Sequence, residues 1–151
     1  MRKKRLLGAA ILAAAGGLSW RPGATETLMA EPPAPRSVKL PVEGQLASFA
    51  GATSWLNSPP LTPAGLRGKV VLVDFWTLTC VNWLRTLPYV RAWAAKYRDK
   101  GLVVIGVHTP EFTVEHDVTN VRRAAQAMRV EYPIAVDSDY GVWNAFHNAY
   151  W

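Results

Sequence analysis

The feature that most restricts the fold of this chain is the apolar run Val70–Trp76, in which Asp74 is the only polar residue. A run of β-branched and aromatic residues is typical of a strand buried on both faces, as in sheets that carry helices on either side. The run at 102–107 predicts a second buried strand, and 133–136 predicts a short third. A short edge strand or hairpin is also expected within 48–56.

Helical periodicity separates these strands. Apolar residues recur at three- and four-residue spacing between 81 and 98, which predicts a helix with a kink at Pro88. The expected buried face of this helix comprises Val81, Leu84, Leu87, Val90, Trp93, Ala94 and Tyr97. A second helix is expected from about 114 to 128, and one or two helical turns over 140–146. Alternating strands and helices imply right-handed parallel crossovers and therefore an α/β fold.

Basic residues are concentrated at the N-terminus. The chain carries a net charge of +6, but four basic residues occupy 2–5, directly before an apolar run at 6–18. This pattern predicts a secretory signal peptide within 1–30, either cleaved or retained as an N-terminal membrane anchor. Residues 31–43 are predicted to form a proline-rich linker to a folded domain. From Glu31 onward the net charge is only +2, so nucleic acid is not an expected partner.

The chain contains a single cysteine, Cys80, which excludes an internal disulfide and a zinc site with two or more cysteines. Its histidines, His108, His116 and His147, lack the spacing of metal ligands, so no metal or other cofactor is expected. Cys80 falls between the strand ending at Trp76 and the following helix. The N–H groups at a helix start favour a thiolate there, whereas the alternative is a small buried apolar residue.

Three segments carry a family resemblance: LRGKVVLVDFWT at 66–77, LRTLP at 84–88 and GVHTPEF at 106–112. They resemble the secreted redoxins of the TlpA and DipZ type, over about 44–151. The resemblance implies a thioredoxin-like α/β fold with a mostly parallel central sheet. It also implies a periplasmic or other extracytoplasmic location, thiol-disulfide exchange with protein thiols or disulfides, and a membrane redox partner. The signal peptide predicted from residues 1–30 agrees with this location.

The chain departs from the Cys-x-x-Cys site of that family, because its sequence is Cys80-Val81-Asn82-Trp83. In the family mechanism the first thiolate attacks a disulfide and the second cysteine then releases the product. We therefore expect Cys80 to be the attacking thiol of a degenerate oxidoreductase whose turnover is impaired by Trp83 at the resolving position. Asp74 matches the family's buried proton acceptor for the thiol that leaves second, a partner that this chain lacks.

A second departure concerns the C-terminal part of the fold. The family continues beyond the positions of Tyr150 and Trp151 with a cis-proline and an antiparallel hairpin, which pairs with the strand equivalent to Val70–Trp76. The resemblance therefore predicts a C-terminally truncated, incomplete domain over 44–151. The most apolar strand would then have an open edge, and the domain would be only marginally stable.

Two alternatives to the oxidoreductase remain. Thr77, three residues before Cys80, resembles the Thr-x-x-Cys site of peroxiredoxins, although Val73 stands where those proteins have proline. This match would make the chain a one-cysteine peroxide-reducing redoxin. The other alternative is a non-catalytic thioredoxin-like interaction module that lends its open strand edge to a partner.

Overall fold

The computed structural model describes residues 40–151. The predicted signal peptide at 1–30 and most of the predicted linker lie outside the described residues. Pro41–Trp151 forms a compact unit of its own. No helix in this unit has the length and apolar character needed to cross a membrane.

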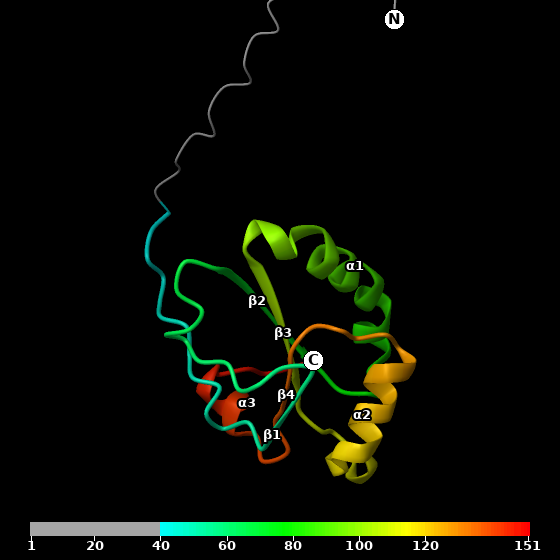
Figure 1. Ribbon diagram of the computed structural model, residues 1–151. Helices are drawn as coiled ribbons and strands as arrows, with labels where there is room; N and C mark the ends of the chain where they lie inside the picture. The colour runs from blue at the N-terminus through cyan, green and yellow to red at the C-terminus, as the bar shows by residue number, and fades with distance from the viewer. Residues whose placement is uncertain (1–39) are drawn as a thin grey trace, which may run out of the picture. The chain divides into compact units, whose positions relative to one another are not determined.

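The centre of the fold is a four-stranded sheet with the order β1-β4-β3-β2 (Figure 1). Its strands are β1 (Ser54–Leu56), β2 (Val70–Trp76), β3 (Leu102–His108) and β4 (Ile134–Val136). β2 pairs with β3 and β3 with β4 in parallel, while β1 pairs antiparallel with β4. The prediction of an α/β fold with a mostly parallel sheet is therefore confirmed.

The helices follow the strands in the expected order, with α1 at Val81–Tyr97, α2 at Val118–Ala127 and α3 at Gly141–Ala145. Short 3-10 turns, η1 (Arg98–Lys100) and η2 (Thr113–His116), flank β3. The single helix predicted over 114–128 is wrong, because extended backbone at Asp117 separates η2 from α2. The Asp117 carboxylate accepts a hydrogen bond from the Thr119 N–H and caps the start of α2.

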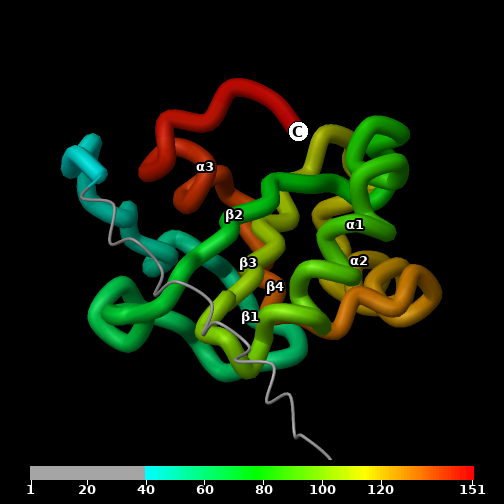
Figure 2. Tube along the Cα trace, turned by 90° about the horizontal axis from the view of Figure 1, so that it is seen from above, coloured from blue at the N-terminus to red at the C-terminus, as the bar shows by residue number. Residues whose placement is uncertain are grey.

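Apolar side chains fill both faces of the sheet. One face is covered by α1 and α2, and the other by α3 and the segment before β2 (Figure 2). The first cluster includes Leu56, Trp76, Trp83, Leu87, Val90, Val104, Val121 and Ile134. The second includes Phe49, Leu66, Ile105, Val107, Ala135 and Val142. Burial on both sides explains why β3 is continuously apolar.

The predicted buried face of α1 is partly wrong. The buried residues are Trp83, Leu87 and Val90, whereas Val81 and Trp93 are 59% and 47% exposed. The buried stripe starts from Trp83 and continues at i+4 and i+7, and Ala94 also packs against the core, so Val81, Leu84 and Trp93 lie off this stripe. α1 runs through Pro88 without interruption.

β2 lies at the edge of the sheet and pairs with β3 along its whole length. No strand within 40–151 pairs with its other side. The open edge that the sequence predicted for Val70–Trp76 is therefore present in the described part of the chain. An unpaired strand edge carries free backbone donors and acceptors that other chains can bind.

Candidate active site

Cys80 is the N-cap residue of α1, at the end of the loop that leaves β2. Its backbone is extended (φ −68°, ψ 109°), and its carbonyl accepts the first helical hydrogen bond from the Leu84 N–H. The Sγ atom lies 3.5 Å from the Trp83 backbone nitrogen, which donates a hydrogen bond to it. The side chain is only partly buried. The first turn of α1 therefore directs the Trp83 backbone N–H at a partly buried thiol.

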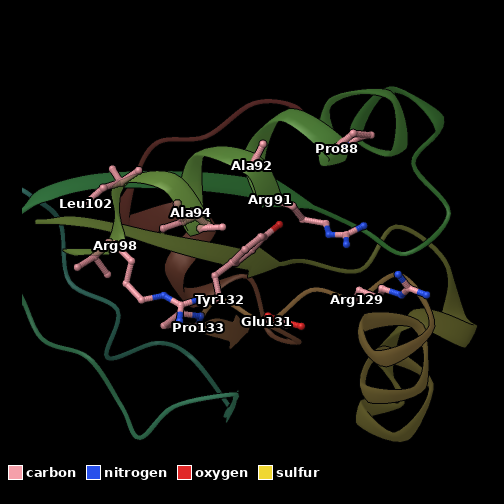
Figure 3. A pocket seen from close by; sticks show the side chains of 13 residues that line it. Pro88, Arg91, Ala92, Ala94, Arg98, Leu102, Arg129, Glu131, Tyr132 and Pro133 are labelled. Atoms are coloured by element: carbon pink, nitrogen blue, oxygen red, sulfur yellow. The ribbon is translucent and has the colours of Figure 1, made fainter. Parts of the chain in front are cut away.

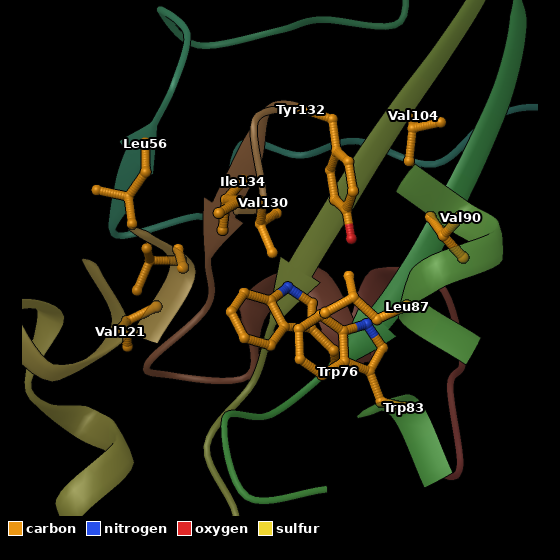
Figure 4. Packing of buried hydrophobic residues seen from close by; sticks show 12 residues of the cluster. Leu56, Trp76, Trp83, Leu87, Val90, Val104, Val121, Val130, Tyr132 and Ile134 are labelled. Atoms are coloured by element: carbon orange, nitrogen blue, oxygen red, sulfur yellow. The ribbon is translucent and has the colours of Figure 1, made fainter. Parts of the chain in front are cut away.

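Trp83 occupies the position where the redoxin motif has its second cysteine, and it is a core residue. Its side chain is 2% exposed and stacks on Trp76, with ring centroids 4.2 Å apart and an angle of 19° between the planes. Figure 4 shows the two indoles together in the cluster beneath α1. A Cβ at Gly106 would lie 2.9 Å from the Trp76 Nε1 atom, so the glycine makes room for this stack.

Asp74 lies in β2 with its carboxylate directed at Trp83. The indole Nε1 of Trp83 donates a hydrogen bond to Asp74 Oδ2 at 2.9 Å. Burial raises the pKa of Asp74 above its ordinary value, and the hydrogen bond from Trp83 opposes part of that rise. The carboxylate therefore has an indole partner where the family mechanism has a thiol.

Glu115, in η2, is a part of the site that the sequence did not reveal. Its side chain is 1% exposed and accepts hydrogen bonds from the backbone and hydroxyl of Thr79 and from the N–H groups of Glu111 and Phe112. Burial alone would raise the pKa of this carboxyl, but the surrounding donors outweigh it and hold the pKa at about 2. A glutamate within a polar stretch of sequence is expected to be solvated, so no local pattern indicates that Glu115 is buried beside Thr79.

His108 is fully buried at the end of β3, with its ring edge-on to Trp76 at a centroid distance of 4.7 Å. Burial lowers its pKa to about 4, which keeps the imidazole neutral at neutral pH. Both ring nitrogens lack a hydrogen-bond partner among the described residues. His116 and His147 are exposed and do not join it, and no cluster of three potential metal-binding side chains occurs within 40–151.

Thr77 is also fully buried. Its backbone carbonyl accepts a hydrogen bond from the Cys80 N–H at 3.1 Å, while its hydroxyl has no hydrogen-bond partner in the described part of the chain. The Thr77 hydroxyl therefore makes no hydrogen bond to the Cys80 thiol.

A groove of about 780 Å³ lies between α1 and residues 129–133 (Figure 3). Tyr132 points into it, and the side chains of Arg91, Arg98 and Arg129 surround it. Cys80 is not among its lining residues. The half-buried thiol at the start of α1 is thus not part of this groove.

Comparison with known proteins assigns the family. No family model matches the chain. The chain is 30% identical over 105 residues to the thiol-disulfide oxidoreductase YkuV of Bacillus subtilis, and the match covers 70% of each protein. The chain belongs to the thioredoxin-like thiol-disulfide oxidoreductases. A solved structure described as a thioredoxin-like protein in the oxidized form agrees, with 32% identity and a TM-score of 0.59 over 65% of this chain and 66% of that one.

Another relative of this thioredoxin-like protein is the protein DipZ of Mycobacterium tuberculosis. The two are 45% identical over 111 residues, which make up 72% of this chain but only 16% of DipZ. The chain therefore spans about a sixth of the length of that relative. The resemblance to redoxins of the DipZ type is confirmed for the redoxin region.

In this thioredoxin-like protein, Trp83 connects the residues that the sequence singled out. Its backbone N–H contacts the Cys80 sulfur, and its indole N–H contacts the Asp74 carboxylate. Cys80, Trp83 and Asp74 therefore do form one site. The sequence correctly placed Cys80 at a strand-to-helix junction, but it did not show that Trp83 is a partner of Asp74.

Proposed function

We propose that this chain is an extracytoplasmic thioredoxin-like protein in which Cys80 forms mixed disulfides with partner proteins and releases them slowly. The observation that carries this proposal is the position of its only thiol. Cys80 caps α1 and is partly exposed, while the buried Trp83 side chain fills the position of a resolving cysteine. This position supports attack by Cys80 on a partner disulfide. The chain has no second thiol to resolve the resulting mixed disulfide within the same molecule.

The reaction begins with the Cys80 thiolate attacking one sulfur of a disulfide in a partner protein. A bond forms between Cys80 Sγ and that sulfur, the partner's S–S bond breaks, and the second partner sulfur leaves as a thiolate that takes a proton from water. The Cys80 sulfur is oxidised and the leaving sulfur is reduced. Release requires a thiol from another molecule, which attacks the mixed disulfide and regenerates the Cys80 thiolate.

Asp74 supports this site by holding Trp83. In the family mechanism a carboxyl at this position accepts a proton from the second thiol, but here it faces the Trp83 indole N–H, which donates a hydrogen bond and does not give up its proton. We propose that Asp74 fixes the indole, which in turn sets the start of α1 and the N–H that contacts Cys80.

The proposed location follows from the predicted signal peptide at 1–30, a linker at 31–43 and a redoxin domain at 44–151. The basic residues at 2–5 and the apolar run at 6–18 support export across a membrane, with cleavage or retention as an anchor. Oxidising conditions outside the cytoplasm supply protein disulfides as substrates. A membrane thiol-disulfide carrier is the proposed redox partner that regenerates Cys80.

The experiment is intact-protein mass spectrometry after incubation with a peptide disulfide at neutral pH. The expected result is one peptide attached to Cys80, stable until an external thiol is added, and no adduct on Cys80→Ser. Absence of an adduct on protein that is folded by circular dichroism would refute the oxidoreductase and favour an interaction module. Rapid loss of hydrogen peroxide with sulfenic acid on Cys80 would instead identify a one-cysteine peroxidase.

A further inference from the structure

Glu115 connects the loop before Cys80 to the loop after β3. Oε1 accepts hydrogen bonds from the Thr79 backbone nitrogen at 3.1 Å and from the Thr79 hydroxyl at 2.7 Å. Oε2 accepts hydrogen bonds from the backbone nitrogens of Glu111 at 2.6 Å and Phe112 at 2.9 Å. Each oxygen thus holds one loop, and the carboxylate is buried between them.

Thr79 is the residue directly before Cys80, so this contact acts on the backbone that carries the thiol. Thr79 itself is exposed, and nothing in its own side chain packing would hold the loop in place. Hydrogen bonds to an ionised carboxylate are about twice as strong as those between neutral groups. A buried carboxylate with this many donors is therefore a rigid support for the turn that places Sγ at the start of α1.

We propose that Glu115 is a positioning residue for Cys80: it fixes Thr79 and thereby the orientation of the thiol toward an incoming disulfide. The inference rests on the proposed function, because it concerns the rate at which Cys80 attacks. Glu115 does not touch the reacting sulfur. It acts through Thr79, 36 residues away in sequence, and its effect depends on the contact between the two side chains.

The test measures the second-order rate constant for mixed-disulfide formation at Cys80 with a peptide disulfide in Glu115→Gln, Thr79→Val and the double variant. Glutamine has the size of glutamate but only one acceptor oxygen, so one loop loses its contact. Valine removes only the hydroxyl hydrogen bond to Oε1. Loss of a hydrogen bond to a charged group predicts a rate about tenfold lower for each single variant. The double variant should lose less rate than the product of the two single losses, because both changes act on the hydrogen bonds between residue 115 and Thr79.

Two controls separate positioning from stability and from charge. Val142→Ala weakens the core on the opposite face of the sheet, so it lowers the melting temperature but should leave the rate unchanged. Asp117→Asn removes a carboxylate two residues from Glu115 that contacts only the start of α2, and it should also react at the wild-type rate. All rates are taken well below the melting temperature of each variant, so that a purely structural role of Glu115 has no effect on them.

The outcomes are distinct. Wild-type rates in both Glu115→Gln and Thr79→Val, with a lowered melting temperature, would overturn the positioning role and leave the proposed function intact. Independent, multiplicative losses in the double variant would show that Glu115 does not act through Thr79, which also overturns it. A wild-type protein that forms no adduct would overturn the proposed function and the inference with it.

Discussion

The indole nitrogen of Trp83 donates a hydrogen bond to the Asp74 carboxylate across 2.9 Å. This contact joins the first turn of α1 to the middle of β2, at the point where a thioredoxin-like oxidoreductase normally pairs a second thiol with a carboxyl group. Trp83 therefore has a structural role of its own. It fills the space, stacks on Trp76 and provides the donor that a buried carboxylate needs.

Trp83→Cys should restore a Cys-x-x-Cys sequence at a large cost in stability. Removing most of a fully buried aromatic side chain typically destabilises a protein by about 3–5 kcal/mol. We expect chemical denaturation to show a loss of this size, and disulfide turnover to appear only in the molecules that stay folded. Trp93→Cys, at an exposed position of the same helix, serves as the control and should change the free energy of unfolding little. Equal stability of the two variants would show that Trp83 is not a core residue.

Asp74→Asn should stabilise the protein at neutral pH. Burial raises the pKa of Asp74 in the folded state, so the folded protein binds the proton more tightly than the unfolded chain does. Stability is then lost as the pH rises through the raised pKa. Asparagine stays neutral and still accepts from the Trp83 indole. The gain in melting temperature over wild type should be larger at pH 7 than at pH 3.5, and a gain that is the same at both values would contradict the proposed cause.

The contribution of Glu115 to stability should depend on pH in the opposite direction to that of Asp74. The pKa of Glu115 is about 2 in the folded state against a usual value of 4.5, so its contribution to stability is complete above pH 4.5 and is lost as the pH falls toward 2. Thermal unfolding of wild type and Glu115→Gln from pH 6 to pH 2 measures the difference. The two melting curves should converge in acid. A constant gap across this range would mean that the carboxylate is not held in its charged form by the two loops.

The open edge of β2 should cause self-association that depends on protein concentration. Val70, at the start of this strand, is 68% exposed, and a lysine there places a charge on the edge. Val70→Lys should lower the apparent mass measured by sedimentation velocity at high concentration. Val114→Lys, which adds the same charge at an exposed position outside the sheet, should have no such effect. A wild-type protein that is monomeric at all concentrations would rule out pairing through this edge.

The two long strands, β2 and β3, were accessible from sequence because they are apolar along almost their whole length. The start of α1 after Cys80 was also accessible, since strand and helix periodicities meet there. The buried face of α1 could not be predicted from the sequence. Val81 and Trp93 are as hydrophobic as core residues, but the stripe that faces the sheet begins at Trp83. Which apolar residues of α1 are buried depends on the angle at which the helix packs on the sheet.

By itself the sequence determined that one thiol lies at the end of a buried strand and the start of a helix, because both patterns are local and leave Cys80 between them. The tertiary structure decided what surrounds that thiol. Trp83 meets Asp74 nine positions away, and Glu115 meets Thr79 across 36 positions. These contacts form only when β2, α1 and the loop following β3 pack together. They therefore cannot be predicted from the spacing of residues in the sequence.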